Sequence, residues 1–259
     1  MAIAVDSSSP ALVAQTSIVT TVTTASFTPP ADAMLVACAF CSQNGSGTMT
    51  FNMSDNQSGT WTTDLVRNAA DSGAYASAAG IYHRASPGVA MTVTATVVNS
   101  FLPTLKVLVL TGVDMASPVG SSAKQGSTST SFATTGYANA RASSIGIAVA
   151  CGSTANGITS NDATASYAGP ASNGHYGVAA YKLPLGAAGA TTTHHFESSG
   201  SPGIHVVQVE FKAAPPARGG DMLPFFAPMH NDDELAARRL ERRRSGLYVP
   251  PARHLVRAA

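Results

Sequence analysis

The feature that most constrains this fold is a series of short strand-like runs that occurs twice in the same order. The first copy reads MLVACAF, GTWTTDL, AGIYHRA, VAMTVTATV and LKVLVLTGV, and the second reads IGIAVAC, NDATASYAG, VAAYKLP, GATTTHHFE and IHVVQVEFK. Val, Ile and Thr suit strands, and the Gly, Asn, Ser and Pro clusters between the runs suit turns. No segment before residue 214 shows a helical period with caps. The sequence therefore predicts an all-β body built from an internal repeat.

Two copies of four or five strands allow two arrangements, which are two sandwiches in tandem or one interlocked jelly roll of eight strands. Each copy is short for a sandwich of its own, and no linker composition separates the copies. The stretch 119–143 between them reads as an extra strand with loops. Tyr82 and Tyr181, 99 residues apart, take matching places. We therefore predict a jelly-roll-like β-sandwich over residues 1–214, with the strands of the two copies interleaved.

A break in composition near Ala214 separates this body from the rest of the chain. Residues 1–214 contain 54 of the 55 Ser and Thr residues and carry a net charge of −2. Residues 215–259 contain eight Arg and five acidic residues, a net charge of +3. Prolines and glycines mark the joint as a linker. We expect a globular body followed by a chemically different C-terminal arm.

The arm, residues 215–259, is predicted to dock onto neighbouring subunits. Its segment DMLPFFAPM is limited by prolines and cannot bury its own aromatic side chains. A possible N-cap at Asn231, a capping-box Glu234 and the stop Gly246 predict a helix over about 232–245. The arginines on one side of this helix suit an acidic protein surface, with a solvated face or a contact to DNA or membrane as alternatives. The candidate docking residues are Leu223, Phe225, Phe226, Leu235, Arg238, Arg239, Leu240, Arg242, Arg243, Arg244 and Tyr248.

The cysteines have a spacing that is used by zinc and redox sites. Cys38 and Cys41 form a C-x-x-C pair, but they lie in a run that reads as a buried strand. Positions three apart in a strand point to opposite faces, and no second C-x-x-C follows. With Cys151 they are expected to be structural. We therefore expect no metal and no cofactor.

The carboxylates and histidines form no catalytic pattern. Asp55 and Asp64 flank a loop, where a glycosidase would use paired carboxylates, but the turn formers SDNQSG explain Asp55 more simply. His194 and His195 point to opposite faces of a strand, and we expect solvated side chains there. No GxSxG, P-loop or HExxH motif occurs. The chain is therefore not expected to be an enzyme.

Charge and hydropathy exclude several classes of partner. The net charge is +1, so no whole-chain field attracts nucleic acid. No run of about 18 apolar residues predicts a membrane helix. The opening MAIAVDSSSPALVAQ lacks the basic and long apolar regions of a signal peptide, so standard secretory export is not expected.

The single tryptophan, Trp61, is either a core or rim aromatic or an exposed ligand platform.

Several runs together resemble a known class of proteins. They are the DAMLVACAF strand after a Thr-rich start, the SDNQSGTWTT turn, the AGIYHRASPGVAMTVTAT hairpin and the closing HVVQVEFKAA strand. Over residues 17–214 this layout resembles virion proteins of tailed bacteriophages, especially small minor tail proteins of phages of actinobacteria. The resemblance implies a β-sandwich displayed on the virion in symmetric copies, and it carries over no catalytic residues.

The combined hypothesis is a non-enzymatic minor tail protein in the virion, which assembles in the host cytoplasm. The arm would dock it to tail or capsid subunits. A module that binds host cell-wall glycans and a capsid decoration protein are the alternatives. A wall-degrading enzyme is disfavoured because no acid–base pair is evident.

Overall fold

The computed structural model describes residues 2–44, 49–70, 75–98, 102–153, 157–169, 175–198 and 203–216. All regular elements in these ranges are β-strands, which pair antiparallel, as the sequence predicts. The described residues up to Pro215 belong to one compact unit. The expected helix at 232–245 and every candidate docking residue of the arm lie outside the described residues. No helix able to cross a membrane occurs in the described ranges.

The first copy of the repeat forms a large and a small antiparallel sheet. The large sheet has the order β1-β9-β4-β7-β6, with β2 also pairing with β9, and the small sheet has the order β3-β8-β5. The strands are β1 (Ala4–Val5), β2 (Val13–Ala14), β3 (Thr21–Thr23), β4 (Met34–Asn44), β5 (Phe51–Asp55), β6 (Thr62–Ala70), β7 (Tyr75–Ala85), β8 (Val93–Val97) and β9 (Thr104–Thr111).

The second copy repeats the order of the large sheet, but its remaining strands form two small sheets in place of one. Its large sheet is β10-β19-β13-β16-β15, and its small sheets are β11-β18-β14 and β12-β17. The strands are β10 (Val119–Ser127), β11 (Ser131–Ala133), β12 (Tyr137–Ala138), β13 (Ile145–Ser153), β14 (Ile158–Ser160), β15 (Ala165–Ala168), β16 (His175–Lys182), β17 (Thr191–Thr192), β18 (His195–Ser198) and β19 (Ile204–Phe211).

The strands of the two copies do not interleave, which corrects the predicted jelly-roll arrangement. Among the described residues no strand of one copy pairs with a strand of the other, and an isolated bridge from Val113 to Ala213 joins the copies. The prediction undercounted the strands of each copy. The segment before residue 17 adds β1 and β2 to one large sheet, and the expected extra strand, β10, extends the other. Each copy therefore forms a large sheet and small-sheet strands of its own.

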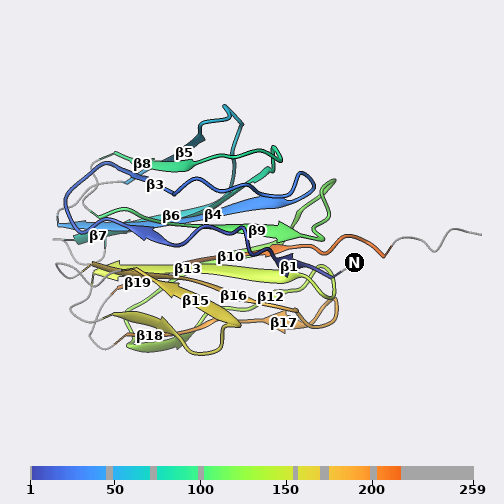
Figure 1. Cartoon of the computed structure of the whole chain (residues 1–259). Helices are drawn as coiled ribbons and strands as arrows, with labels where there is room; N and C mark the ends of the chain where they lie inside the picture. Colours follow the sequence, from blue (N-terminus) through green and yellow to red (C-terminus); the bar gives the residue numbers. More distant parts are fainter. Residues whose placement is uncertain are drawn as a thin grey trace, which may run out of the picture. The chain divides into compact units, whose positions relative to one another are not determined.

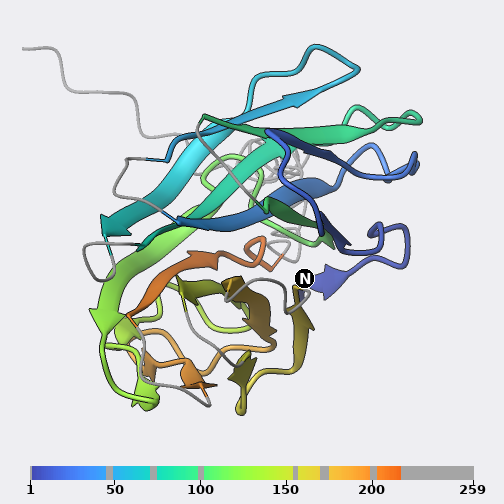
Figure 2. The same cartoon turned by 90° about the vertical axis from the view of Figure 1, so that its left-hand side faces the viewer.

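The four layers enclose three hydrophobic clusters. The two large sheets face each other across a central cluster, and each has a small sheet on its other face (Figure 1). In Figure 2 the first copy, blue to green, lies above the yellow and orange strands of the second. The central cluster includes Met34, Val36, Cys38, Ile81, Leu108, Leu110, Ile145, Ile147, Val149, Val207, Val209 and Phe211. The first outer cluster includes Val22, Leu35, Ala37, Cys41, Phe51, Tyr82, Met91, Val93, Val107 and Val109. The second outer cluster contains Phe132, Ala148, Ala150, Ile158, Val178, Ala180, Phe196, Ile204 and Val206.

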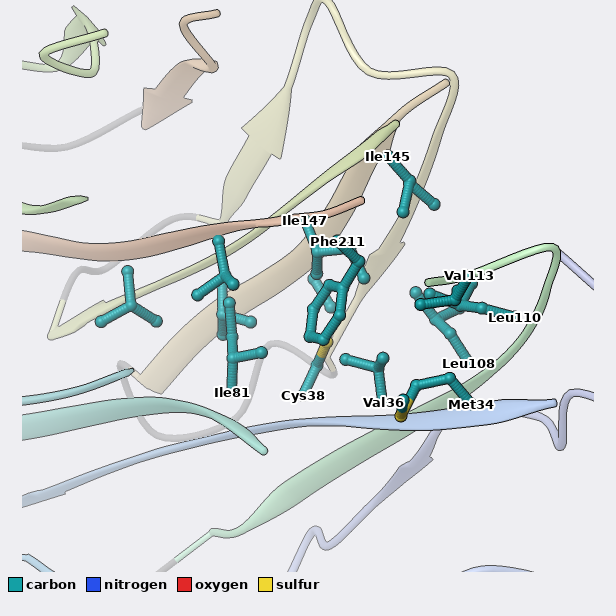
Figure 3. Packing of buried hydrophobic residues seen from close by; sticks show 14 of the residues in the cluster. Met34, Val36, Cys38, Ile81, Leu108, Leu110, Val113, Ile145, Ile147 and Phe211 are labelled. Atoms are coloured by element: carbon teal, nitrogen blue, oxygen red, sulfur yellow. The ribbon is translucent and has the colours of Figure 1, made fainter. Parts of the chain in front are cut away.

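This layering explains the hydropathy patterns of the strands. Both faces of β9 and β19 are covered, so LKVLVLT and IHVVQVEF are buried along almost their whole length. β8 lies in an outermost sheet, so buried and half-buried residues alternate along it. Figure 3 shows the central cluster, where Ile145, Ile147 and Phe211 face Met34 and Cys38 from the opposite sheet. Burying such a side chain stabilises the fold by about 1.5–3 kcal/mol.

The matching of Tyr82 with Tyr181 holds for the strands but not for the residues. Tyr82 pairs with Ala37 and lies in the first outer cluster. Tyr181 pairs with Ile147 and packs against the central cluster, on the opposite face of its sheet. The counterpart of Tyr82 by cluster is Ala180. A shift of one residue exchanges the two faces of a strand, so the alignment of the two tyrosines is one position out of register.

Candidate functional site

The carboxylate of Asp55 organises the turn after β5. Its Oδ1 accepts hydrogen bonds from the backbone N–H groups of Gln57 at 2.8 Å and Gly59 at 3.2 Å. Its Oδ2 accepts from the indole Nε1 of Trp61 at 2.8 Å and from Arg84 Nη1. Burial alone would raise the pKa of Asp55, but these donors hold it below its ordinary value. Asp55 is thus an ionised structural centre, consistent with the predicted turn role.

The same bonds decide what Trp61 can offer to a ligand. Trp61 is half-buried and packs against the first outer cluster. Its indole N–H is already used by Asp55. A platform for a sugar would expose the ring face and keep the polar edge available. Trp61 therefore lies at the edge of the first outer cluster with its indole N–H bound to Asp55.

The second copy has an ion pair at the equivalent place. Lys182 Nζ, on β16, lies 2.5 Å from Asp162 Oδ2, in the turn after β14. Asp162 Oδ1 accepts a hydrogen bond from the backbone N–H of His195 at 2.9 Å. In the first copy Arg84 on β7 and Asp55 at the end of β5 take these positions. Each copy therefore uses one basic residue and one carboxylate to tie its large sheet to a turn from its small sheet.

Asp64 on β6 and His83 on β7 form a pair within the first copy, beside Phe211 of the second copy. His83 Nδ1 lies 2.6 Å from Asp64 Oδ1, and the His83 ring stands edge-on to Phe211 at 5.8 Å. Asp64 occupies a register shift of β6, between Thr63 and Leu65. Burial raises the pKa of Asp64, and the hydrogen bond and charge of His83 oppose that rise. Asp55 and Asp64 thus each pair with a different basic side chain, Arg84 and His83 respectively.

The cysteines lie on opposite faces of β4, as their spacing predicts. Cys38 is in the central cluster and Cys41 is in the first outer cluster, where its Sγ lies 3.3 Å from Met49 Sδ. Burial raises the pKa of the Cys38 thiol to about 12, although Lys106 on the paired strand β9 lowers it. A buried, protonated thiol is chemically inert. In the described ranges, no group of three or more His, Cys, Asp or Glu side chains is arranged to hold a metal ion.

Lys106 is a buried cation that the sequence reasoning missed. Its Nζ donates to the Pro10 carbonyl at 2.6 Å and lies 4.2 Å from the ring centre of Tyr167, on β15 of the other copy. Burial lowers its pKa, and the nearby Cys38 opposes that effect. Lys106 therefore links the N-terminal segment, its own sheet and the opposite sheet. Its sequence signal is a lone charge within the apolar run LKVLVL.

The histidines correct the expectation of solvated side chains. His194 is fully buried and stacks on Phe196, with ring centres 6.3 Å apart. His195 is only half-buried, and its Nε2 lies 3.0 Å from Ser131 Oγ. The predicted opposite directions are therefore confirmed, but one of them is inward. His205 is also buried, and its Nδ1 accepts a hydrogen bond from Arg67 Nε at 2.9 Å across the two copies.

A polar interior of the second copy was also missed by the sequence reasoning. Glu210 is buried, and its carboxylate accepts hydrogen bonds from the backbone N–H groups of Ser121, Ala140 and Arg141. Gln208 accepts from the Thr134 hydroxyl at 2.8 Å and donates to a neighbouring carbonyl. The signal that could have found them is the pair of polar residues inside the apolar run HVVQVEF. These groups hold loops and strands together.

Comparison with known proteins adds no relative. No protein-family model, curated protein or solved structure matches the chain.

Proposed function

We propose that this chain is a non-enzymatic structural component of a bacteriophage virion, and specifically a minor tail protein. The observation that supports the proposal is the use of the body's buried ionisable groups. Asp55, Asp64, Lys106 and Glu210 each contact a partner within the body, and these contacts join strands, turns and copies. Such a body is a rigid spacer rather than a reaction site, which suits a displayed virion protein.

The C-terminal arm, residues 215–259, is proposed to dock the body to neighbouring tail or capsid subunits. Phe225 and Phe226 lie in a proline-bounded segment, and burying each would be worth about 1.5–3 kcal/mol. The cluster Arg242–Arg244 favours an acidic partner surface. A symmetric homo-oligomer would supply both kinds of contact.

We further propose that the body is two β-sandwiches in tandem, packed back to back through the central cluster. The support is that each large sheet has its own small sheet and its own outer cluster. In a displayed protein this arrangement lengthens the body without a flexible linker.

Incorporation into virions tests the docking proposal. A chain truncated after Ala214 is expected to remain soluble and folded but to be absent from purified virions, as judged by mass spectrometry and immunogold labelling. Arg242→Glu with Arg243→Glu should reduce incorporation most at low salt, where charges are least screened. Arg257→Glu, elsewhere in the arm, is the matched control. Normal copy number of the truncated protein would refute docking through the arm.

A second candidate is recognition of a host cell-wall glycan, and the outer face of β3-β8-β5 favours it. Thr21, Thr23 and Ser54 are exposed there, and Thr23 Oγ1 lies 2.9 Å from Thr94 Oγ1. Hydroxyl groups of this kind can exchange hydrogen bonds with sugars. A glycan array with the full chain separates this role from a purely structural one, and labelling on the capsid rather than the tail would favour a capsid decoration protein.

A further inference from the structure

Two buried polar side chains of the second copy face the same position above β13. Tyr137 lies in β12 and is 6 % exposed, while His194 lies between β17 and β18 and is 0 % exposed. Within the described residues, the Tyr137 hydroxyl and both ring nitrogens of His194 make no hydrogen bond to a protein atom. Buried donors and acceptors without partners are destabilising, so these groups call for a further partner.

Gly146, on β13, marks the position that they face. A Cβ atom on Gly146 would lie 2.5 Å from Tyr137 Oη, 3.4 Å from His194 Nε2 and 3.3 Å from Leu185 Cδ2. Gly146 pairs with Lys182 and Glu210. Two polar atoms therefore converge over a residue that has no side chain of its own.

The first copy has an apolar residue at the position equivalent to Gly146. Leu35 has the same neighbours in register, since it pairs with Arg84 and Val109. Leu35 is fully buried in the first outer cluster. The second copy replaces this leucine by glycine and surrounds the position with a hydroxyl and an imidazole.

The protonation states limit what can bind there. Burial, and to a smaller extent the charge of Lys182, lower the pKa of His194 to about 4, although Asp162 opposes this shift. At neutral pH the ring is therefore uncharged, with one N–H donor and one bare acceptor nitrogen. Burial, and then the charge of Glu210, raise the pKa of Tyr137, so its hydroxyl stays protonated. The matching partner is small, neutral and able both to donate and to accept.

We propose that a buried water molecule binds between Tyr137 Oη and His194 Nε2, above Gly146. Buried waters occupy polar sites with two to four partners, and these two groups supply two. The water joins β12 to the segment between β17 and β18. It provides a hydrogen-bond partner for the Tyr137 hydroxyl and the His194 imidazole, which surround the position that Leu35 occupies in the first copy. This site is independent of the proposed virion role.

A double-mutant cycle on the full chain tests the site. Tyr137→Phe and His194→Phe are each expected to raise the equilibrium constant for unfolding in urea about tenfold, because each leaves the water and the other side chain short of a partner. The double variant should lose less unfolding free energy than the sum of the losses in the two single variants, since one water serves both groups. Tyr82→Phe, which removes a buried tyrosine hydroxyl from the first copy, is the matched control and should change the constant less than about threefold.

The contrary outcomes are equally specific. A dry site predicts that Tyr137→Phe lowers the unfolding constant, because an unsatisfied hydroxyl is removed. Additive losses would mean that the two groups share no partner. A crystal structure at about 1.5 Å decides without variants, and so remains informative should His194→Phe fail to fold. It should show one water bonded to both atoms, and a direct bond from Tyr137 to His194 or no water would overturn the proposal.

Discussion

The two copies of the repeat share a strand order but have different interiors. In the first copy, Val107 and Val109 on β9 face the small sheet and belong to an apolar outer cluster. In the second copy the corresponding positions of β19 are Gln208 and Glu210, and both are buried. The pairing order and the basic–acidic tie between the sheets are kept in both copies. Topology therefore tolerates a change from an apolar to a polar interior.

The condition for this tolerance is that the polar groups find partners. Glu210 is held by three backbone N–H groups, and Gln208 uses both ends of its amide. A buried polar group with partners is compatible with stability, whereas one without partners costs roughly 1–3 kcal/mol. Ser121 on β10 and the loops 134–135 and 139–141 of the second copy supply these partners.

The largest expected contrast is between the two ion pairs. The side chain of Asp55 is buried and accepts from four donors, so Asp55→Asn should destabilise the protein by about 3–5 kcal/mol by stranding the Arg84 cation. The Asp162 side chain is 33 % exposed, so Asp162→Asn should cost about 1 kcal/mol or less. Urea denaturation measures both. Equal losses would show that the two ion pairs contribute equally to stability and that their different burial has no energetic consequence.

The second contrast is a pH dependence that His194 adds to the second copy. The pKa of His194 is about 4 in the folded state and has its ordinary value of 6.5 on unfolding. Between these two pH values the unfolded state binds a proton that the folded state does not bind. The contribution of His194 to the unfolding free energy is therefore fully present above pH 6.5 and is lost as the pH falls towards 4. The loss is on the order of 3 kcal/mol.

Subtraction of a variant isolates this contribution. The difference in unfolding free energy between the wild type and His194→Phe, followed from pH 7.5 to 3.5, should decline across that window and then level off. Other titrating groups, including Asp64 and Asp162, are present in both proteins and largely cancel. A flat difference would mean that His194 is not buried in its neutral form.

The third contrast exchanges the interiors at one position. Gln208→Val leaves the Thr134 hydroxyl and a backbone carbonyl without their partner and should cost about 1–3 kcal/mol. Adding Thr134→Val should not recover this loss, because the buried backbone N–H of His194 donates to Thr134 Oγ1 at 2.9 Å and would lose its acceptor. In the first copy Val107→Gln should cost a similar amount, because its surroundings are apolar. A neutral Val107→Gln would show that the first copy has hidden hydrogen-bonding capacity.

The smallest expected effect is on the outer face of the first copy. Thr23 is exposed and exchanges a hydrogen bond with Thr94. Thr23→Val should change stability by no more than about 0.5 kcal/mol, because its partner can turn to water. A melting temperature that differs from that of the wild type by more than a few degrees would indicate that the hydrogen bond between Thr23 and Thr94 contributes to stability.

Properties that depend on local alternation could be predicted from the amino-acid sequence. The β class, the opposite faces of Cys38 and Cys41, the turn role of Asp55 and a repeated strand order all follow from a two-residue period and from turn chemistry. These features involve residues near one another in the chain, so no knowledge of distant pairing is needed.

Only the tertiary structure decided which strands share a sheet and which side of each strand is covered. The two copies proved to be separate in their pairing, and Tyr82 and Tyr181 proved to lie on opposite faces. Lys106 lies over the ring of Tyr167, which is 61 positions away and belongs to the opposite large sheet. The backbone N–H of the buried His194 donates to Thr134, which is 60 positions away. Such outcomes depend on register and layer order, which are set by long-range hydrogen bonding and by burial on both faces of a sheet.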